Sequence, residues 1–327
     1  MPLGDPFLTT WEVIDGPTQH NERDVAMKLL VFTARPDVGS NHRLAEAGHG
    51  LGVDVEIVDA TRAVVQTGRG LTDILMDGHS VLDALATKPG EKSGLAAIVR
   101  VGNWRPETML AMVEALQEAG VSTPNGSEAF RVGRDHWRSL LKLSRAGIPV
   151  PKTLAAMEPE TTAAAAVGLL GLPVVVKLRR SRMGVGVIVC RQLDHLESVL
   201  DSLWRLGDEF IVQEWVECGG RSTRVLIAGK QVIASAHFEA VGGEWRSNGA
   251  RGGLALKAEL TQDQLGLAVA AGQALDLGLC GVDLLDSPTG TVVCEVNPTP
   301  GFKQVESATG IDIASEIVRY AVELAKK

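Results

Sequence analysis

Between Met27 and Gly120 the chain alternates short apolar segments with amphipathic ones, and this alternation constrains the fold more than any other feature. MKLLVFTA, VDVEIVDA and GLAAIVRVG are predicted strands, and NHRLAEAGHGLG and PETMLAMVEALQEAG are predicted helices. Strands that alternate with helices form parallel sheets, because the helix returns the chain to the same end of the sheet. The sequence therefore predicts an N-terminal parallel α/β domain at 27–122, preceded by a mixed, polar extension at 1–26.

The rest of the chain predicts two α+β lobes, at 123–205 and 206–327. The first contains the predicted helices GRDHWRSLLKLSRAG and EPETTAAAAVGLLG and the strands LPVVVKLRR and VGVIVCR. From about Trp204 short strands follow with tight connections (DEFIVQEWVE, RSTRVLIAG and KQVIASAHFEA), which is typical of antiparallel pairing. A helix, the hairpin CGVDLLDSPTGTVVCEVN and a final amphipathic helix complete the chain.

Composition excludes several classes of protein. A chain of 327 residues with 45% hydrophobic and 22% charged residues is folded, and its net charge of -8 argues against nucleic-acid binding. No signal peptide and no apolar run of about 20 residues is present, so we expect a cytoplasmic protein that does not span a membrane. The cysteines show no C-x-x-C spacing and are expected to be reduced core thiols: Cys190, Cys218, Cys280 and Cys294.

The hairpin ending in VVCEVNPTPGF gathers oxygen-bearing side chains. Side chains two residues apart on a strand share a face, so Glu295 and Asn297 point the same way. If the DSPTG turn pairs Leu285 with Thr291, Asp283 pairs with Val293 on that same face. Adjacent carboxylates repel unless a cation lies between them, and Mg²⁺ or Mn²⁺ prefers oxygen ligands. We expect Asp283, Glu295 and Asn297 to hold such an ion; a solvated hairpin face is the alternative.

Such an ion usually accompanies a nucleotide, and three further segments have the composition of a nucleotide-binding site. The P-loop motif and the third glycine of the dinucleotide fingerprint are absent, but MGVGVIV, with Met183, Gly184 and Gly186, fits a glycine flap over phosphates or a simple hairpin turn. Lys177 ends the strand VVVK and places an ammonium group toward those phosphates. VQEWVE fits an adenine pocket or an ordinary core strand.

Basic residues near these segments are candidates for binding anions. Arg179, Arg180 and Arg182 in KLRRSR lead into the glycine flap, near phosphates or an acidic substrate, although a solvated face has the same composition. Arg100 ends a strand of the first domain, at the edge where open parallel sheets bind ligands, and is a candidate for holding an anionic substrate.

The ordered set VVVKL, MGVGV, VQEWV, RSNGARGG, GVDLL, CEVNPTPG and TGIDIA resembles the ATP-grasp superfamily, and within it the RimK-type carboxylate–amine (alpha-L-glutamate) ligases. The resemblance extends from about Met27 to the end of the chain. It implies an ATP-grasp fold, in which two α+β lobes clasp ATP, and an ATP- and magnesium-dependent ligase. Such an enzyme phosphorylates a carboxylate, and an amine then attacks the acyl phosphate to give an amide, ADP and phosphate.

The resemblance also implies roles for individual residues. Lys177 contacts the phosphates, and Asp283, Glu295 and Asn297 hold magnesium. The adenine hinge comprises Gln213, Glu214, Trp215 and Val216. The phosphate site includes Arg246, Ser247 and Asn248, and Arg246, Arg251 and Arg224 are candidates to stabilise the transferring phosphoryl group and the oxyanion. A surface salt bridge is the alternative role for any one of these arginines.

The chain departs from the family pattern at two positions. His136 occupies the place of a lysine in an RDK motif, and Ser222 replaces the aspartate of D-x-R. A histidine meets an α-phosphate with full charge only below its usual pKa of ~6.5. These departures leave open a nucleotide-binding regulatory or scaffold protein without turnover, and the first domain alone leaves open a nicotinamide oxidoreductase.

The resemblance implies that the substrates are a carboxylate and an amine on small molecules, peptides or a protein tail, with glutamate or another amino acid as one of them. The loop and helix start at GFKQVESATGIDIA help form the acceptor site in the RimK-type ligases. Lys303, in that segment, either holds a substrate carboxylate or is merely exposed. The resemblance also suggests a homodimer or homotetramer.

Overall fold

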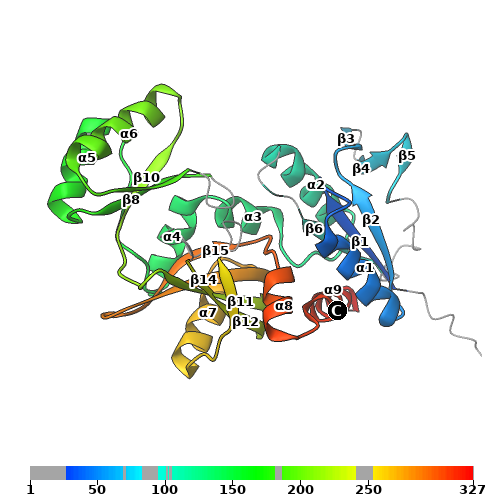
Figure 1. Cartoon of the computed structure of the whole chain (residues 1–327). Helices are drawn as coiled ribbons and strands as arrows, with labels where there is room; N and C mark the ends of the chain where they lie inside the picture. The colour runs from blue at the N-terminus through cyan, green and yellow to red at the C-terminus, as the bar shows by residue number, and fades with distance from the viewer. Residues whose placement is uncertain are drawn as a thin grey trace, which may run out of the picture.

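The computed structural model describes residues 27–68, 71–82, 95–100, 102, 105–180, 186–240 and 253–326. These residues form four sheets with helices packed around them, and a smaller lobe projects from the rest of the molecule at the upper left of Figure 1.

The first sheet is parallel and has the strand order β2-β1-β6, as the alternation of strands and helices predicts. Its elements are β1 (Lys28–Thr33), α1 (Gly39–Gly50), β2 (Asp54–Asp59), β6 (Leu95–Arg100) and α2 (Pro106–Glu118). Apolar residues of α2 cover one face of this sheet. The other face is covered by α1 and by α9 (Ile313–Lys326), the last helix of the chain, which lies beside β1 and β6 in Figure 1.

A small antiparallel sheet, which the sequence analysis did not predict, follows β2. It comprises β3 (Ala63–Gly68), β4 (Leu71–Met76) and β5 (His79–Ser80). Asp77 and Gly78 connect β4 to β5 with positive φ angles of 52° and 82°. An Asp-Gly pair between short strands is a hairpin signal, so this feature was readable from the sequence.

The projecting lobe, here called the central lobe, has an antiparallel sheet in the order β7-β10-β8-β9. Two helices pack against this sheet and bury a separate apolar core. The elements are β7 (Thr153–Leu154), α5 (Pro159–Leu169), β8 (Val174–Leu178), β9 (Val187–Cys190), α6 (Leu193–Arg205) and β10 (Phe210–Glu214).

The largest sheet is antiparallel and has the order β13-β12-β11-β14-β15. Its strands are β11 (Arg221–Ala228), β12 (Gln231–Glu239), β13 (Leu254–Lys257), β14 (Leu279–Ser287) and β15 (Gly290–Asn297). Helix α7 (Gln262–Ala274) packs on one face, and α8 (Lys303–Thr309) and α9 pack on the other. A capping box starts α7: Thr261 Oγ1 accepts from Gln264 N at 3.2 Å, and Gln264 Oε1 accepts from Thr261 N at 3.0 Å.

Two details of the lobes differ from the sequence-based division. The strand β10 pairs with β7 and β8, whereas the division at 205/206 assigned it to the C-terminal lobe. Helices α3 (Ser127–Gly133) and α4 (His136–Arg145) share a core with α7 and the largest sheet, whereas the division assigned them to the central lobe. Each difference arises from pairing between segments that are distant in the sequence, and local patterns do not report such pairing.

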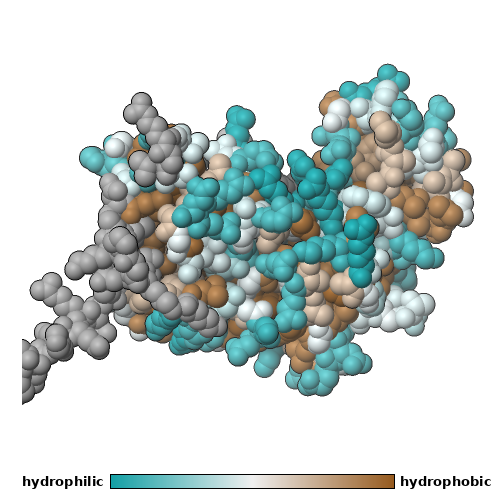
Figure 2. Space-filling view, turned by 180° about the vertical axis from the view of Figure 1, so that it is seen from behind, coloured by the Kyte–Doolittle hydropathy of each residue, from teal (hydrophilic) through white to brown (hydrophobic). Residues whose placement is uncertain are grey.

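Polar and apolar residues alternate over most of the face shown in Figure 2, and hydrophilic residues line the junction between the central lobe and the rest of the molecule. The central lobe carries brown, apolar surface at the right of that view. Its exposed large apolar residues are Met157, Val167, Leu169, Leu172, Leu193, Trp204 and Leu206. None of the helices in the described ranges is both long and apolar enough to cross a membrane. The oligomeric state stays a prediction.

Gly278, directly before β14, packs against the segment that follows the first domain and against α9, and we expect Gly278→Ala to destabilise the protein. A Cβ atom there lies 2.4 Å from Tyr320 Oη and 2.5 Å from the Pro124 carbonyl oxygen, which already accepts the Gly278 N–H at 3.1 Å. Overpacking of this kind costs about 1–3 kcal/mol. Gly266→Ala is the control, because nothing lies within 4 Å of its Cβ position in α7 and alanine favours the helix by about 1 kcal/mol. Urea denaturation of both variants measures the difference; equal stabilities contradict the prediction.

Candidate active site

The hairpin β14–β15 places the predicted metal ligands on one face. Asp283 lies opposite Glu295, and Gly281 lies opposite Asn297. Directly opposed residues share a face, so the two carboxylates and the amide project from the same side of the sheet. A bulge makes this possible. Asp283 pairs with Glu295, and the next residue, Leu284, pairs with Val293, so Cys294 is an extra residue on β15.

The predicted register of this hairpin is wrong by one residue near the turn. Leu284, and not Asp283, lies opposite Val293, and Leu285 does not pair with Thr291. Beyond Leu284 the bulge shifts the register by one more residue in the same direction, and this second shift returns Asp283 and Glu295 to a shared face. Sequence patterns did not reveal this bulge, because valine, cysteine and glutamate all fit a regular strand there.

Arg224 on β11 holds Asp283 through two hydrogen bonds. Its Nε donates to Oδ1 at 2.8 Å and its Nη2 to Oδ2 at 2.7 Å. The nearby carboxylates raise the pKa of Arg224, Asp283 most strongly and Glu295 less so. Phe238 stacks on the guanidinium, 5.6 Å from the ring centre. Arg224, predicted to stabilise reacting charge, therefore lies in this cluster with its guanidinium committed to Asp283.

Lys177 at the end of β8 reaches the same cluster from the central lobe. Its Nζ donates to Gln213 Oε1 at 2.6 Å and lies 3.5 Å from Cys294 Sγ on β15. Gln213 Nε2 in turn donates to Thr153 Oγ1 at 3.0 Å. Lys177 and Gln213 are only 7% and 2% exposed, so a rigid chain of hydrogen bonds fixes the ammonium group. Burial raises the pKa of Cys294, so the thiol is protonated at neutral pH.

His136, at the first position of α4, faces this cluster too. Burial lowers its pKa, Glu295 opposes that effect, and Lys177 adds to it. The imidazole is therefore neutral at neutral pH, whereas charge on His136 is needed to reproduce the lysine of the family pattern. His136 lies beside the cluster at the place of the family lysine, but it does not carry the positive charge of that lysine at neutral pH.

Asp135 connects α4 to the end of β8 and was not singled out from the sequence. It is 1% exposed, and both its oxygens lie 2.9 Å from Arg179 Nε. It also caps α4 by accepting from Arg138 N at 3.1 Å. Arg179 donates further to Glu209 at 3.1 Å. The predicted role of Arg179 near phosphates is not supported by this arrangement, because its guanidinium holds the central lobe to α4. Arg180 is more exposed and lies 3.9 Å from Asp135.

The predicted adenine hinge lies at the end of β10. Gln213 is committed to Lys177, and Glu214 bonds to Lys152 through both its backbone N–H, at 2.9 Å, and its carboxylate, at 2.8 Å. Trp215 and Val216 follow the strand, so they are better placed than the first two residues to line a ligand. Arg191 lies over the Trp215 ring at 5.7 Å.

The glycine turn is only partly described. Gly186 has φ +75°, and its carbonyl accepts from Leu178 N at 3.0 Å, so this glycine closes the β8–β9 hairpin. Several predicted site residues lie outside the described ranges: Met183, Gly184, Arg246, Ser247, Asn248 and Arg251, with Arg182 of the basic run.

Arg100 lies in a pocket next to the loop that follows Asn297. Its Nη2 donates to Ser40 Oγ at 3.1 Å, and its guanidinium lies 5.3 Å from the Phe302 ring centre. Burial lowers the pKa of Arg100 to about 10, so it stays charged at neutral pH. Arg100 lines the pocket together with Thr123, Asn125, Phe130, Pro298 and Thr299. The Thr299 hydroxyl is buried and has no hydrogen-bond partner among the described residues.

Lys303 reaches the start of α1, close to Ser40. A Cβ atom on Gly39 would lie 2.6 Å from Lys303 Nζ, so a larger residue there would displace the ammonium group. The first turn of α1 contains no acidic residue, and no side chain caps it. Among the residues that the structure describes, no carboxylate forms an ion pair with Arg100 or Lys303. Two cations thus lie near the first turn of α1, where the positive end of the helix dipole also favours an anion.

The donor set at the hairpin fits a divalent cation. Within the described ranges Glu295 has no hydrogen bond or ion pair, although it lies opposite a second carboxylate. Asn297 Oδ1 accepts from Thr299 N at 2.8 Å and retains a second lone pair. No group of three or more His, Cys, Asp or Glu side chains with metal-binding geometry occurs in the described ranges, so a site here depends on two carboxylates and an amide.

We expect Lys177→Met to raise the KM for ATP. Loss of one charged hydrogen bond to a phosphate costs about 1.5–3 kcal/mol, which corresponds to about a 10- to 100-fold change. Methionine keeps most of the volume of the side chain. Lys142→Met is the control, because Lys142 forms an exposed ion pair with Asp276 at 2.8 Å. Steady-state kinetics over a range of ATP concentrations measures the effect, and an unchanged KM contradicts it.

Comparisons with known proteins place this geometry in a known fold. The solved structure of the ATP-grasp ligase PsnB with its minimal precursor superposes with a TM-score of 0.70, at 19% identity, over 91% of this chain and 99% of PsnB. D-alanyl-alanine synthetase A from Vibrio cholerae superposes with a TM-score of 0.65, at 16% identity, over 92% and 99% of the two chains. The fold is therefore that of the ATP-grasp ligases.

A model of the RimK-like ATP-grasp domain matches residues 133–321, more than half of the chain. The chain is 33% identical over 303 residues to the probable alpha-L-glutamate ligase 2 of Pseudoalteromonas atlantica, covering 92% of this chain and 97% of the relative. It is 34% identical over 295 residues to the probable alpha-L-glutamate ligase of a Marinomonas species, covering 90% and 95%. The chain belongs to the RimK-like ATP-grasp family.

Membership of this family confirms the predicted fold and the predicted class of enzyme, an ATP-dependent ligase that joins a carboxylate to an amine. The alternative of a nucleotide-binding protein without turnover is not favoured. ATP-grasp ligases use ATP and Mg²⁺, and one structure of PsnB contains Mg and ADP.

Proposed function

We propose that this ligase adds glutamate, through its amine, to the carboxylate of a small molecule or peptide. The names of the relatives, probable alpha-L-glutamate ligases, support glutamate as one substrate. The observation that carries the proposal is the presence of two sites: a carboxylate cluster on the hairpin, and, beside the loop that follows it, Arg100 and Lys303, which form no ion pair with any described residue.

In this proposal Asp283, Glu295 and Asn297 hold magnesium, which would neutralise charge on the phosphates of ATP. Lys177 binds those phosphates from a fixed position, since Gln213 and Thr153 hold it. The terminal phosphate passes to the substrate carboxylate, which becomes an acyl phosphate while ADP leaves. Arg224 orients Asp283, because its guanidinium donates one hydrogen bond to each carboxylate oxygen.

Arg100 and Lys303 bind the carboxylates of glutamate that do not react, and the first turn of α1 adds backbone N–H groups. The glutamate amine then attacks the acyl carbon, the C–O bond to phosphate breaks, and the amine loses a proton. The products are an amide and inorganic phosphate. Phe302 stacks on Arg100, and Ser40 accepts one of its N–H groups, so the guanidinium is oriented before the substrate arrives.

Release of ADP with a panel of carboxylates and amines tests the proposal. We expect ADP to form only when glutamate, an acid acceptor, ATP and Mg²⁺ are all present, and mass spectrometry to show one added glutamyl residue per product. EDTA should stop the reaction, and Mn²⁺ should restore it. No amine-dependent release of ADP with any pair contradicts the ligase mechanism, and release with other amino acids but not glutamate contradicts the proposed substrate.

A further inference from the structure

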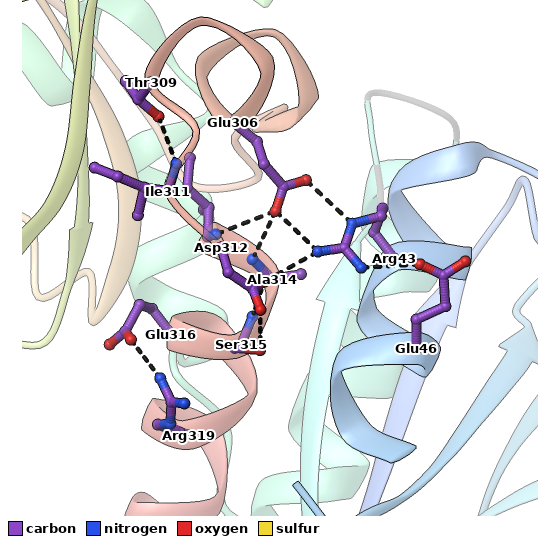
Figure 3. Close-up of polar contacts among 11 residues, drawn as sticks. Arg43, Glu46, Glu306, Thr309, Ile311, Asp312, Ala314, Ser315, Glu316 and Arg319 are labelled. Atoms are coloured by element: carbon purple, nitrogen blue, oxygen red, sulfur yellow. Dashed lines mark hydrogen bonds and ion pairs between the residues drawn. The ribbon is translucent and has the colours of Figure 1, made fainter. Parts of the chain in front are cut away.

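One guanidinium bonds three carboxylates where the first domain meets α8 and α9 (Figure 3). Arg43 of α1 contacts Glu306 through Nε–Oε2 at 3.3 Å and Nη2–Oε1 at 3.2 Å. It also donates to Asp312 Oδ1 at 3.0 Å and to Glu46 Oε2 at 2.8 Å. These acids raise the pKa of Arg43, and the hydrogen bonds that Arg43 donates to Glu306 have the largest effect.

Glu306 also fixes the helix that follows. Its Oε1 accepts from the backbone N–H groups of Ile313 at 3.1 Å and Ala314 at 3.4 Å, at the start of α9. Asp312 accepts from Ser315 N at 3.1 Å, in the same turn. The carboxylate of Glu306 therefore ties together α1, α8 and α9, as the dashed lines in Figure 3 show.

The bridge lies one helical turn away from the anion site described above. Gly39 and Arg43 are four residues apart on α1, and Lys303 and Glu306 are three apart on α8, so each pair lies on one helix face. The two helices thus meet at two levels, Lys303 against Gly39 and Glu306 against Arg43. A shift of α8 along α1 moves Lys303 away from Ser40 and Arg100.

Electrostatics explains why such a bridge is needed. Lys303 Nζ lies beside Gly39 at the positive end of α1, and Arg100 donates to Ser40, the next residue of that helix, so these positive charges repel one another until an anion binds. Arg43 and Glu306 supply attraction between the same two helices. They can hold the site in its binding geometry before the anion arrives, which lowers the cost of binding.

We propose that Arg43 and Glu306 form a positioning pair that sets Lys303 for the acidic substrate; this inference rests on the proposed function. The pair does not touch the substrate. It acts through the placement of α8, and it was not predicted from the sequence.

The test compares KM for glutamate with kcat and with KM for ATP. We expect Arg43→Ala and Glu306→Gln to raise the KM for glutamate about tenfold, with kcat and the KM for ATP within about twofold of wild type. Arg43→Lys should raise the KM for glutamate less than Arg43→Ala does, because an ammonium group keeps the charge but makes only some of the hydrogen bonds of the planar guanidinium. Arg319→Ala is the control, since Arg319 pairs with Glu316 on the exposed side of α9.

A purely structural bridge gives a different result. If Arg43→Ala lowers the melting temperature but leaves the KM for glutamate unchanged, the inference is overturned. A second measurement does not need turnover: acetic anhydride labelling of Lys303, followed by mass spectrometry, should differ several-fold between wild type and Arg43→Ala without substrate. If the wild-type enzyme forms no ADP with glutamate, the proposed function fails, and equal labelling of Lys303 in both proteins then overturns the inference separately.

Discussion

Glu295→Gln is expected to reduce ADP formation about 1000-fold, because it removes one of two carboxylates from the candidate metal site. Glutamine preserves the shape of the side chain and its place opposite Asp283. The loss of charge, and not a loss of packing, is therefore the cause of the effect. Binding of Mn²⁺, followed by electron paramagnetic resonance in the presence of an ATP analogue, should weaken in parallel.

Asp286→Asn is the matched control for this variant. Asp286 lies on the same hairpin, is exposed, and bonds only to Gln264 and Thr291 among the described residues. We expect its ADP formation and Mn²⁺ binding to equal those of wild type. Unchanged Mn²⁺ binding in Glu295→Gln shows that the ion lies elsewhere, whatever happens to turnover.

Asp135→Asn is expected to lower the free energy of unfolding by about 3 kcal/mol, because it breaks an ion pair whose carboxylate is buried and leaves the half-buried guanidinium of Arg179 without its main partner. Asparagine still accepts the hydrogen bond that caps α4, so the loss reports the ion pair. Arg179 lies two residues beyond Lys177, so the KM for ATP should also rise. Urea denaturation followed by circular dichroism measures the first effect.

Asp201→Asn provides the comparison for this second prediction. Asp201 pairs with Arg205 on α6, where both side chains are largely exposed, and exposed pairs contribute little. We expect no measurable change in its stability or in its KM for ATP. Equal stabilities of Asp135→Asn and Asp201→Asn rule out a stabilising role for the contact between α4 and β8.

The sequence predicted those parts of the fold that local patterns encode. Alternation of strands and helices gave the parallel sheet, and the DSPTG turn gave the hairpin with Asp283 and Glu295 on one face. The family was identified from the ordered set of sequence motifs and not from the arguments about strands, helices and charges. The residues of the nucleotide site stay a prediction, although Lys177, Arg224 and His136 all lie within electrostatic reach of Glu295 or its neighbours.

Contacts between distant segments could not be predicted. Asp135 looked like part of a degenerate motif, and nothing local indicates that it receives Arg179 from 44 residues further on. Likewise, the pairing of Arg43 with Glu306 spans 263 residues. The bulge at Cys294 was also not predicted, because a bulge depends on the partner strand and not on the composition of the strand itself.

The last helix closes the face of a sheet built from the first strands, since Ile317, Val318 and Ala321 share a core with Leu29 and Ile98. When the ribosome has just completed β6, only α1 is available to cover this face of the sheet, and the part that α9 covers is still exposed. This face is fully covered only after α9 has been synthesised, more than two hundred residues further on. The first sheet is therefore completed late, although its strands are synthesised first. Deleting α9 should consequently destabilise the first sheet, although that sheet lies at the opposite end of the sequence, as well as the largest sheet on which α9 also packs.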